Sequence, residues 1–455
     1  MKLFNGIMLI SAVVLFNACG ETGTGCRLAN LEQANAQCKY LEVKANPSDM
    51  GDNRKINIYY TRVPAKNSSN KKAPIVYLTG GPGSSSVIDV DKILSHDFYS
   101  SLRENHDLIA IDYRGTGFST PFPKCKGGAE DINNCVKNLN KDIHVKDYTS
   151  KNIAIDIDKV LEKENIKKAN LLGVSYGTRL ALTIARDFPS RVKSLTLDGL
   201  FPIEVNGLSQ AREAILDKLK TIEDKYSRDY PRENFATKLD AVIDKIKSVK
   251  GNDSTAAFLK ALTSHAYEDN VSEKYVKPNF DKILDGTHPF IRTAGNLEIG
   301  EIREKSFSTI MSFAIILYEE YAFIHDEDQQ YYNFGFSQKV TSVLSTFRGG
   351  SPVPISEIAK LRFDISPKNN IEKQAVRTNI KTLILSAEHD NQTPLYWSKQ
   401  ARQYLTNSKL FFFKDTEHGL SMDSPYAQVL IDKFIESENI NILDNERNDH
   451  FIQIP

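Results

Sequence analysis

Ser175 has the sequence context of an activated nucleophile. It is the central residue of GVSYG at 173–177, a G-x-S-x-G pattern. The apolar run 169–174 predicts a buried strand before it, and apolar residues at helical spacing up to Phe188 predict a helix after it. Strand, sharp turn and helix in this order are typical of a serine hydrolase elbow, because flanking glycines permit the strained backbone that exposes the hydroxyl. An ordinary glycine-rich loop is the alternative.

Three of the nine histidines, His389, His418 and His450, follow Ser175 outside the helical segment described below. A serine hydroxyl needs a histidine base, and chains with this elbow carry the acid and then the base after the serine. His418 lies in a short loop past an apolar strand that ends at Phe413, whereas His450 is near the end of the chain. We therefore predict His418 as the base.

Two aspartates, Asp198 and Asp390, end predicted strands and could orient the base. Asp390 precedes the turn NQTP at 391–394, which can hold a carboxylate at the carboxyl edge of a sheet, where sites of open α/β sheets lie. Asp198 begins the helical segment and is more simply explained as a structural residue. We predict Asp390 as the acid.

Acyl transfer also needs hydrogen-bond donors for the developing oxyanion. The backbone N–H of Tyr176 is one predicted donor. Gly80 and Gly81 begin the run GGPG, directly after the strand that ends at Leu78, where the second donor of such folds originates. Without side chains, these two glycines let a substrate approach the backbone. A plain turn is the alternative.

Strands and helices alternate along much of the chain and predict an α/β fold with a mostly parallel central sheet covered by helices on both faces. Charged amphipathic helices at 211–226 and 235–249 interrupt this alternation and indicate a large helical lid. The predicted strands are 56–61, 74–78, 108–112, 169–174, 195–197, 382–386 and 410–413. The predicted parts are core at 38–202, lid at 203–377, core at 378–436 and a loosely ordered tail at 437–455.

Balanced charge argues against a nucleic-acid partner. Lys plus Arg and Asp plus Glu both number 58 in 455 residues, so no net field attracts a polyanion. Cysteines and histidines show no zinc spacing, and no cofactor or metal is expected. Small molecules or short peptides are the expected partners.

The first residues predict export. A basic start, an apolar run at 7–16 and Ala18 before Cys19 resemble a bacterial lipoprotein signal, with a signal peptide at 1–18, lipid on Cys19 and a tether at 19–37. An ordinary secretory signal is the alternative. Either way, we expect a protein of the cell envelope without a transmembrane helix in its mature form, attached to a membrane only through the lipid.

Five cysteines leave four once Cys19 is lipidated. In an oxidising compartment, their spacing favours two disulfides among three possible connectivities. The expected pairs are Cys26 with Cys38 and Cys125 with Cys135.

Taken together, four landmarks resemble the α/β-hydrolase family of proline iminopeptidases, and more closely its secreted tripeptidyl aminopeptidase-like branch. They are GGPG at 80–83, DYRGTGFS at 112–119, GVSYGT at 173–178, and DNQTP at 390–394 with His418-Gly419. The resemblance implies a triad of Ser175, Asp390 and His418. It also implies removal of residues or short peptides from free amino termini. The second landmark has no evident chemical role, and we expect a structural turn there.

Glu319 and Glu320 resemble the family's Cys-x-Glu-Glu segment, with Leu317 in place of the cysteine. The resemblance implies that they receive the substrate ammonium, whereas a solvated helix face is the alternative. We expect a serine exopeptidase that acts through an acyl-enzyme on Ser175. A carboxylic ester hydrolase with the same triad is one alternative, and a non-catalytic envelope binding protein on a hydrolase scaffold is another.

Overall fold

A computed structural model describes residues 26–125, 129–139, 143–250, 305–323, 370–390 and 392–454, together with 361, 363 and parts of 255–289. The predicted signal peptide at 1–18, the predicted lipid site Cys19 and the first part of the tether lie outside these residues. So does Asn391, which follows the predicted acid.

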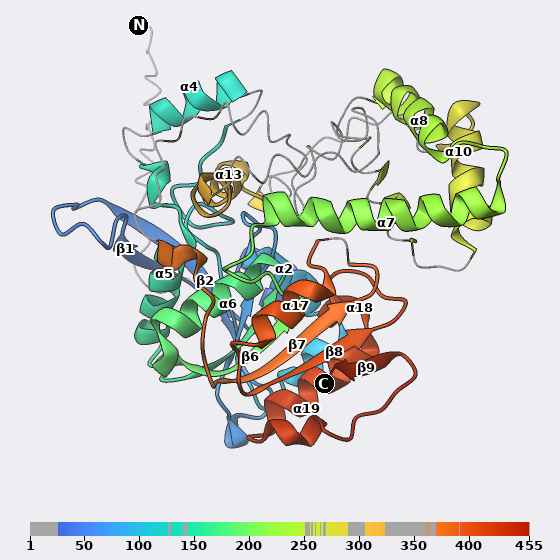
Figure 1. Cartoon of the computed structure of the whole chain (residues 1–455). Helices are drawn as coiled ribbons and strands as arrows, with labels where there is room; N and C mark the ends of the chain where they lie inside the picture. Colours follow the sequence, from blue (N-terminus) through green and yellow to red (C-terminus); the bar gives the residue numbers. More distant parts are fainter. Residues whose placement is uncertain are drawn as a thin grey trace, which may run out of the picture.

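A nine-stranded sheet in the order β1-β2-β4-β3-β5-β6-β7-β8-β9 forms the centre of the molecule (Figure 1). The six strands from β4 to β8 in this order are parallel, and the pairs β1–β2, β2–β4 and β8–β9 are antiparallel. The predicted mostly parallel sheet is therefore confirmed. The strands are β1 (Gln37–Lys44), β2 (Lys55–Val63), β3 (Ile75–Leu78), β4 (Leu108–Ile111), β5 (Ala169–Val174), β6 (Val192–Asp198), β7 (Lys381–Ala387), β8 (Ser408–Phe413) and β9 (Phe451–Ile454).

Two apolar clusters cover the two faces of the sheet. Alternation along β3 sends Val76 and Leu78 to one face and Ile75 and Tyr77 to the other, because successive side chains of a strand point to opposite faces. The first face packs on α5 (Ser150–Lys163) and α6 (Tyr176–Asp187). The second packs on α2 (Ser86–Ile93), α3 (Asp97–Leu102) and α19 (Pro425–Glu436). This is the predicted three-layer α/β architecture.

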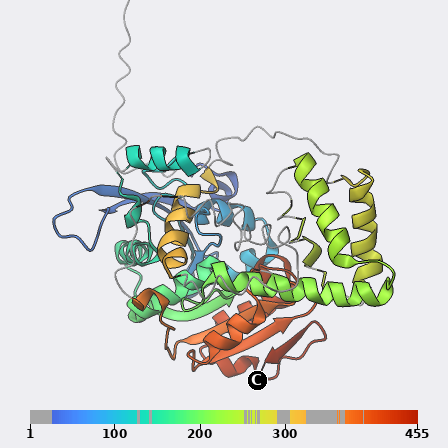
Figure 2. The same ribbon diagram turned by 45° about the horizontal axis from the view of Figure 1, so that its top comes forward.

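A helical segment separates β6 from β7 in the chain. Its helices α7 (Gly207–Asp229), α8 (Phe235–Lys250) and α10 (Lys277–Leu284) form an apolar cluster of their own, beside the α/β core in both views (Figures 1 and 2). In contrast, α13 (Thr309–Glu319) packs into the core cluster of α5 and α6. The predicted helices at 211–226 and 235–249 correspond to α7 and α8. The other α-helices of the described ranges are α1 (Ala29–Gln33), α4 (Ala129–Leu139), α17 (Leu395–Arg402) and α18 (Leu420–Asp423).

Both ends of the described chain are more ordered than the sequence suggests. Leu28 and Leu31 are buried, and the Leu31 N–H donates to Asp91, so the second part of the expected tether packs on the core. The expected loose tail contains a 3-10 helix (Ile440–Leu443) and β9, whose Phe451 packs edge-on against Phe411. Disulfides join Cys26 to Cys38 and Cys125 to Cys135, which are the predicted pairs. Within the described ranges, no helix is both long and apolar enough to cross a bilayer.

Candidate active site

Ser175 occupies a sharp turn between β5 and α6. Its φ of 57° and ψ of −124° lie in a region that non-glycine residues rarely adopt. The turn requires glycine at 177, because an added Cβ there would lie 1.9 Å from the carbonyl oxygen of Leu78. The Ser175 N–H donates to the Asp198 carbonyl over 2.8 Å, which ties the turn to the next strand. The predicted strand, turn and helix are all present.

Asp390 and His418 form a direct pair. The Nδ1 atom of His418 lies 2.7 Å from Oδ2 of Asp390, and the Asp390 side chain is only 1% exposed. The backbone N–H groups of Gln392 and Thr393 donate to the other carboxylate oxygen over 2.7 and 2.9 Å. Burial alone would raise the pKa of Asp390, but the charge and hydrogen bond of His418, together with Thr393, hold it below its usual 3.8. Asp390 is therefore a carboxylate that can fix the histidine tautomer.

Asp198, the other strand-end aspartate, holds the segment that follows His418. Its buried carboxylate accepts hydrogen bonds from the Leu420 N–H over 3.0 Å and from the Ser421 N–H and hydroxyl over 2.7 and 2.6 Å. The next residue, Gly199, lies so close to His418 that an added Cβ would meet the ring Cε1 at 2.8 Å. Asp198 thus holds the segment after His418 in place, in agreement with a structural role.

All these groups lie at one edge of the sheet. β5, β6, β7 and β8 are adjacent and parallel, so their carboxyl ends lie together. Those ends carry Ser175, Asp198, Asp390 and the loop with His418. His450, in contrast, stacks on Tyr426 with ring centroids 4.3 Å apart and belongs to the C-terminal segment.

The loop after β3 passes directly over the serine. An added Cβ at Gly80 would lie 2.8 Å from the Cβ of Ser175 and 3.5 Å from its Oγ. Gly81 has a φ of 46°, which favours glycine. Tyr176, which follows the serine in the chain, is the first residue of α6, where backbone N–H groups have no partner within the helix. The two segments predicted to supply oxyanion donors therefore both lie next to Ser175.

Asp112 fastens the glycine loop to the DYRGTGFS turn. One carboxylate oxygen accepts from the Ser85 hydroxyl over 2.6 Å and the Val87 N–H over 3.1 Å, and the other accepts from the Phe118 N–H over 2.8 Å. Burial raises the pKa of Asp112 to about 6 despite these bonds. An added Cβ at Gly117 would lie 2.0 Å from the carboxylate, so the turn has room only for glycine. The expected structural turn beside the glycine loop at 80–83 is observed.

Glu319 and Glu320 are both 4% exposed, so the solvated helix face considered for them is wrong. The Glu319 carboxylate accepts from the Ser150 N–H over 2.8 Å and the Ser150 hydroxyl over 2.9 Å, and this hydroxyl lies 2.6 Å from the Tyr176 hydroxyl. Glu320 pairs with Arg179 and, over 2.8 Å, with Lys373. Both carboxylates thus have internal donors, and their contact with a substrate ammonium stays a prediction.

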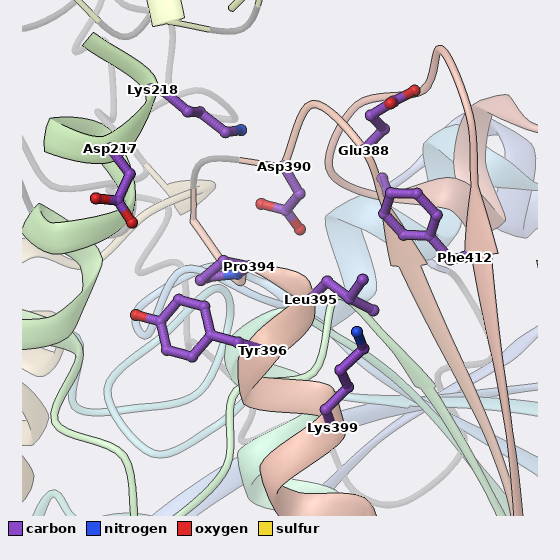
Figure 3. Close-up of a pocket in the computed structure, with 10 residues that line it drawn as sticks. Asp217, Lys218, Glu388, Asp390, Pro394, Leu395, Tyr396, Lys399 and Phe412 are labelled. Atoms are coloured by element: carbon purple, nitrogen blue, oxygen red, sulfur yellow. The ribbon is translucent and has the colours of Figure 1, made fainter. Parts of the chain in front are cut away.

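The sequence reasoning missed Lys218, which lines a cavity of about 340 Å³ between α7 and α17 (Figure 3). Its side chain points toward Asp390, and the residue is only 4% exposed. Burial lowers the pKa of Lys218 to about 8, although Asp390 and Glu388 favour its charged form. Helical spacing could have indicated that Lys218 is buried, because it follows the buried Ile215 by three positions and so lies on the same face of α7. The cavity is lined by Asp217, Lys218, Ala387, Glu388, Asp390, Pro394, Leu395, Tyr396, Lys399 and Phe412.

Among the described residues, Glu388, His389 and Asp415 bring potential metal-ligand atoms within 4.8 Å of one another. Contacts within the protein account for this grouping. The Asp415 N–H donates to Glu388 over 3.0 Å, and the His389 N–H donates to the carbonyl of Thr416 over 2.9 Å. The cluster therefore joins the two loops that carry Asp390 and His418.

The chain belongs to the alpha/beta hydrolase fold family, whose model matches residues 73–425. It is 27% identical over 188 residues to the putative hydrolase YuaR of Escherichia coli (strain K12), covering 37% of this chain and 36% of that protein. It is 26% identical over 233 residues to serine protease Hip1 of Mycobacterium tuberculosis (strain ATCC 25618 / H37Rv), covering 45% and 43%. It is 30% identical over 141 residues to the proline iminopeptidase of Neisseria gonorrhoeae, covering 30% and 37%.

These matches span less than half the length of each curated relative. Among solved structures, the proline iminopeptidase of Mycobacterium smegmatis aligns with a TM-score of 0.45 and 15% identity, covering 90% of this chain and all of that one.

Proposed function

We propose that the protein is a serine exopeptidase that cleaves peptide bonds near the free amino termini of short peptides. The observation that carries the proposal is the Asp390–His418 pair, at the same sheet edge as the strained Ser175 turn. Membership of the hydrolase family supports the reaction class. Two relatives bear the names serine protease and proline iminopeptidase, which supports a peptide substrate.

In the proposed reaction, Ser175 attacks the scissile carbonyl carbon while His418 takes the hydroxyl proton. Asp390 orients the ring and stabilises the imidazolium that forms. The N–H groups of Tyr176 and the Gly80–Gly81 loop stabilise the oxyanion, each donor contributing about 3 kcal/mol. His418 then protonates the leaving amine, and water releases the peptide or amino acid from the acyl-enzyme.

Two measurements test this proposal. Ser175→Ala should abolish hydrolysis of a peptidyl p-nitroanilide with a free amine, and only the wild-type protein should be labelled by a fluorophosphonate probe. Acetylating the amine should remove most of the activity, because an exopeptidase of this kind recognises the ammonium group. Unchanged hydrolysis by Ser175→Ala would contradict the mechanism.

A carboxylic ester hydrolase is the second candidate. The observation that favours it is the internal neutralisation of Glu320 by Arg179 and Lys373. Such an enzyme would hydrolyse p-nitrophenyl esters and treat free and acetylated peptides alike. A non-catalytic binding protein, the third candidate, would leave the fluorophosphonate probe unreacted.

We further propose that the protein is exported and anchored to a bacterial membrane through a lipid on Cys19. The two disulfides support export, since disulfides persist in oxidising compartments. Cys19→Ser should release the protein from the membrane fraction and abolish incorporation of radiolabelled palmitate. Palmitate labelling of the Cys19→Ser variant would contradict the anchor.

A further inference from the structure

The loop at 199–206, between β6 and α7, connects the reaction site to the lid. It begins at Gly199, against the His418 ring, and Phe201 donates its N–H to Thr178 over 2.8 Å. The Arg179 guanidinium then donates to the carbonyls of residues 202, 203 and 205 over 2.8, 3.3 and 2.7 Å. The loop is therefore held rigidly over the first turn of α6, the helix that Ser175 precedes.

A buried charge cluster underlies this loop. Arg179 pairs with Glu320, and Lys373 donates to Glu320 over 2.8 Å and to the carbonyl of Val205 over 2.9 Å. Glu319 lies 3.9 Å from Arg179 and accepts both hydrogen bonds from Ser150 described above. Glu319 and Glu320 therefore both accept hydrogen bonds from donors within the protein.

Glu204, in the middle of the loop, differs from these two glutamates. Its Oε1 atom is buried and accepts no hydrogen bond from any residue that the structure describes. Burial raises the pKa of Glu204, and a hydrogen bond from its own backbone N–H, together with the charges of Arg179 and Lys373, offsets this only in part. A buried carboxylate oxygen without a donor is costly, and such an atom calls for a partner that arrives with a ligand.

The charges of the cluster indicate what that partner is. In their ionised forms, Glu204, Glu319 and Glu320 carry three negative charges, whereas the neighbouring Arg179 and Lys373 carry two positive charges. The nearby Arg186 pairs with both Asp187 and Glu372, so it brings no net positive charge to the cluster. A cationic ligand would therefore offset the excess negative charge and supply the missing donor.

We infer that Glu204 receives the α-ammonium group of the peptide substrate. This inference rests on the proposed exopeptidase function and assigns the ammonium contact to a residue other than Glu319 and Glu320. An ammonium group has three N–H donors, so it can fill the open acceptor of Glu204. A carboxylate on a rigid loop that starts beside His418 fixes the position of the amine relative to the scissile bond.

The test compares Glu204→Gln with wild-type protein on three substrates. These are a peptidyl p-nitroanilide with a free amine, its N-acetyl form and p-nitrophenyl acetate, which has no amine. Glu204→Gln should lower kcat/KM for the free amine about 10- to 100-fold, because a hydrogen bond to a charged group is lost. Hydrolysis of p-nitrophenyl acetate should remain within about twofold, and it reports that the variant folds with an intact nucleophile. Glu372→Gln is the matched control, because the Glu372 carboxylate already pairs with Arg186. It should leave kcat/KM unchanged for all three substrates.

The outcomes separate the two proposals. If wild type prefers the free amine but Glu204→Gln keeps the same kcat/KM for it, the inference about Glu204 is wrong and the exopeptidase proposal stands. If wild type hydrolyses free and acetylated peptides equally, or neither of them, the exopeptidase proposal fails and the inference falls with it. If Glu204→Gln does not fold, Glu204→Asp is the second variant. It keeps the carboxylate charge but shortens the side chain by one methylene group. It should therefore retain part of the preference for the free amine over the N-acetyl form.

Discussion

His418 Nδ1 lies 2.7 Å from Asp390 Oδ2, across two loops that follow the adjacent parallel strands β7 and β8. The two loops are also joined by contacts that involve neither the His418 ring nor the Asp390 carboxylate. One of them is the hydrogen bond from the Asp415 N–H to the Glu388 carboxylate. The position of the histidine is thus set by the pairing of two strands and their loops. A hydrogen bond at Nδ1 leaves Nε2 as the nitrogen that can accept a proton.

The first prediction concerns this pair. Asp390→Asn keeps the shape of the acid but removes its charge, so the histidine loses its preferred tautomer and the stabilisation of its cation. We expect kcat for p-nitrophenyl acetate to fall about 10³- to 10⁴-fold. Asp415→Asn, an exposed aspartate three residues before His418, is the control and should remain active. A loss of less than tenfold for Asp390→Asn would show that Asp390 does not orient the base.

The second prediction separates Asp198 from Asp390. Asp198→Asn can no longer accept all three hydrogen bonds from Leu420 and Ser421, which leaves buried donors without partners. We expect a loss of about 2 kcal/mol in the free energy of unfolding and a smaller fall in kcat than for Asp390→Asn. Urea denaturation and steady-state kinetics on both variants measure the two effects. Equal loss of kcat with unchanged stability would instead indicate that Asp198 takes part in the chemistry.

The third prediction tests how closely the glycine loop at 80–83 fits against Ser175. In Gly80→Ala, the new methyl group would lie 2.8 Å from the Cβ of Ser175 and 3.1 Å from the carbonyl oxygen of Val174, so the loop and the serine must separate. Displacing a reacting group by about 1 Å can lower the rate about 100-fold, and we expect a fall in kcat of this order.

Gly286→Ala is the control for this variant. Its φ of 79° makes alanine unfavourable, but nothing lies within 4 Å of the added Cβ. It should therefore cost about 1 kcal/mol of stability through backbone strain alone and leave kcat unchanged. Full activity in Gly80→Ala would show that the loop does not approach the reacting serine.

Local sequence patterns were sufficient to predict which side chains follow strand ends at the carboxyl edge of the sheet. Ser175 and Asp390 each follow a short apolar strand, and strand ends in a parallel sheet meet at one edge, so their proximity could be expected. β1 and β9 were missed because edge strands carry mixed polar and apolar residues and resemble loops. The environment of Glu319 could not be expected either, since its donor Ser150 lies 169 residues away in the chain.

The last prediction concerns Lys218 in α7, whose side chain points toward Asp390 (Figure 3). Burial lowers the pKa of Lys218 from 10.5 to about 8, whereas the unfolded chain keeps the ordinary value. Between these two pH values the unfolded state binds more protons than the native state, so stability rises with pH through this window. Below pH 8 both states are protonated, and the native protein bears the whole cost of burying the charge, which is at most about 3 kcal/mol.

Lys218→Met removes that cost. It should therefore raise the free energy of unfolding at pH 7, and its advantage over wild type should shrink as pH rises from 8 to 10. Urea denaturation at pH 7 and pH 10 measures both values. Lys399→Met, which lines the same cavity but is exposed, should show no such pH dependence. A Lys218→Met variant that is less stable than wild type at pH 7 would mean that the attraction of the Lys218 ammonium to Asp390 and Glu388 exceeds the cost of its burial.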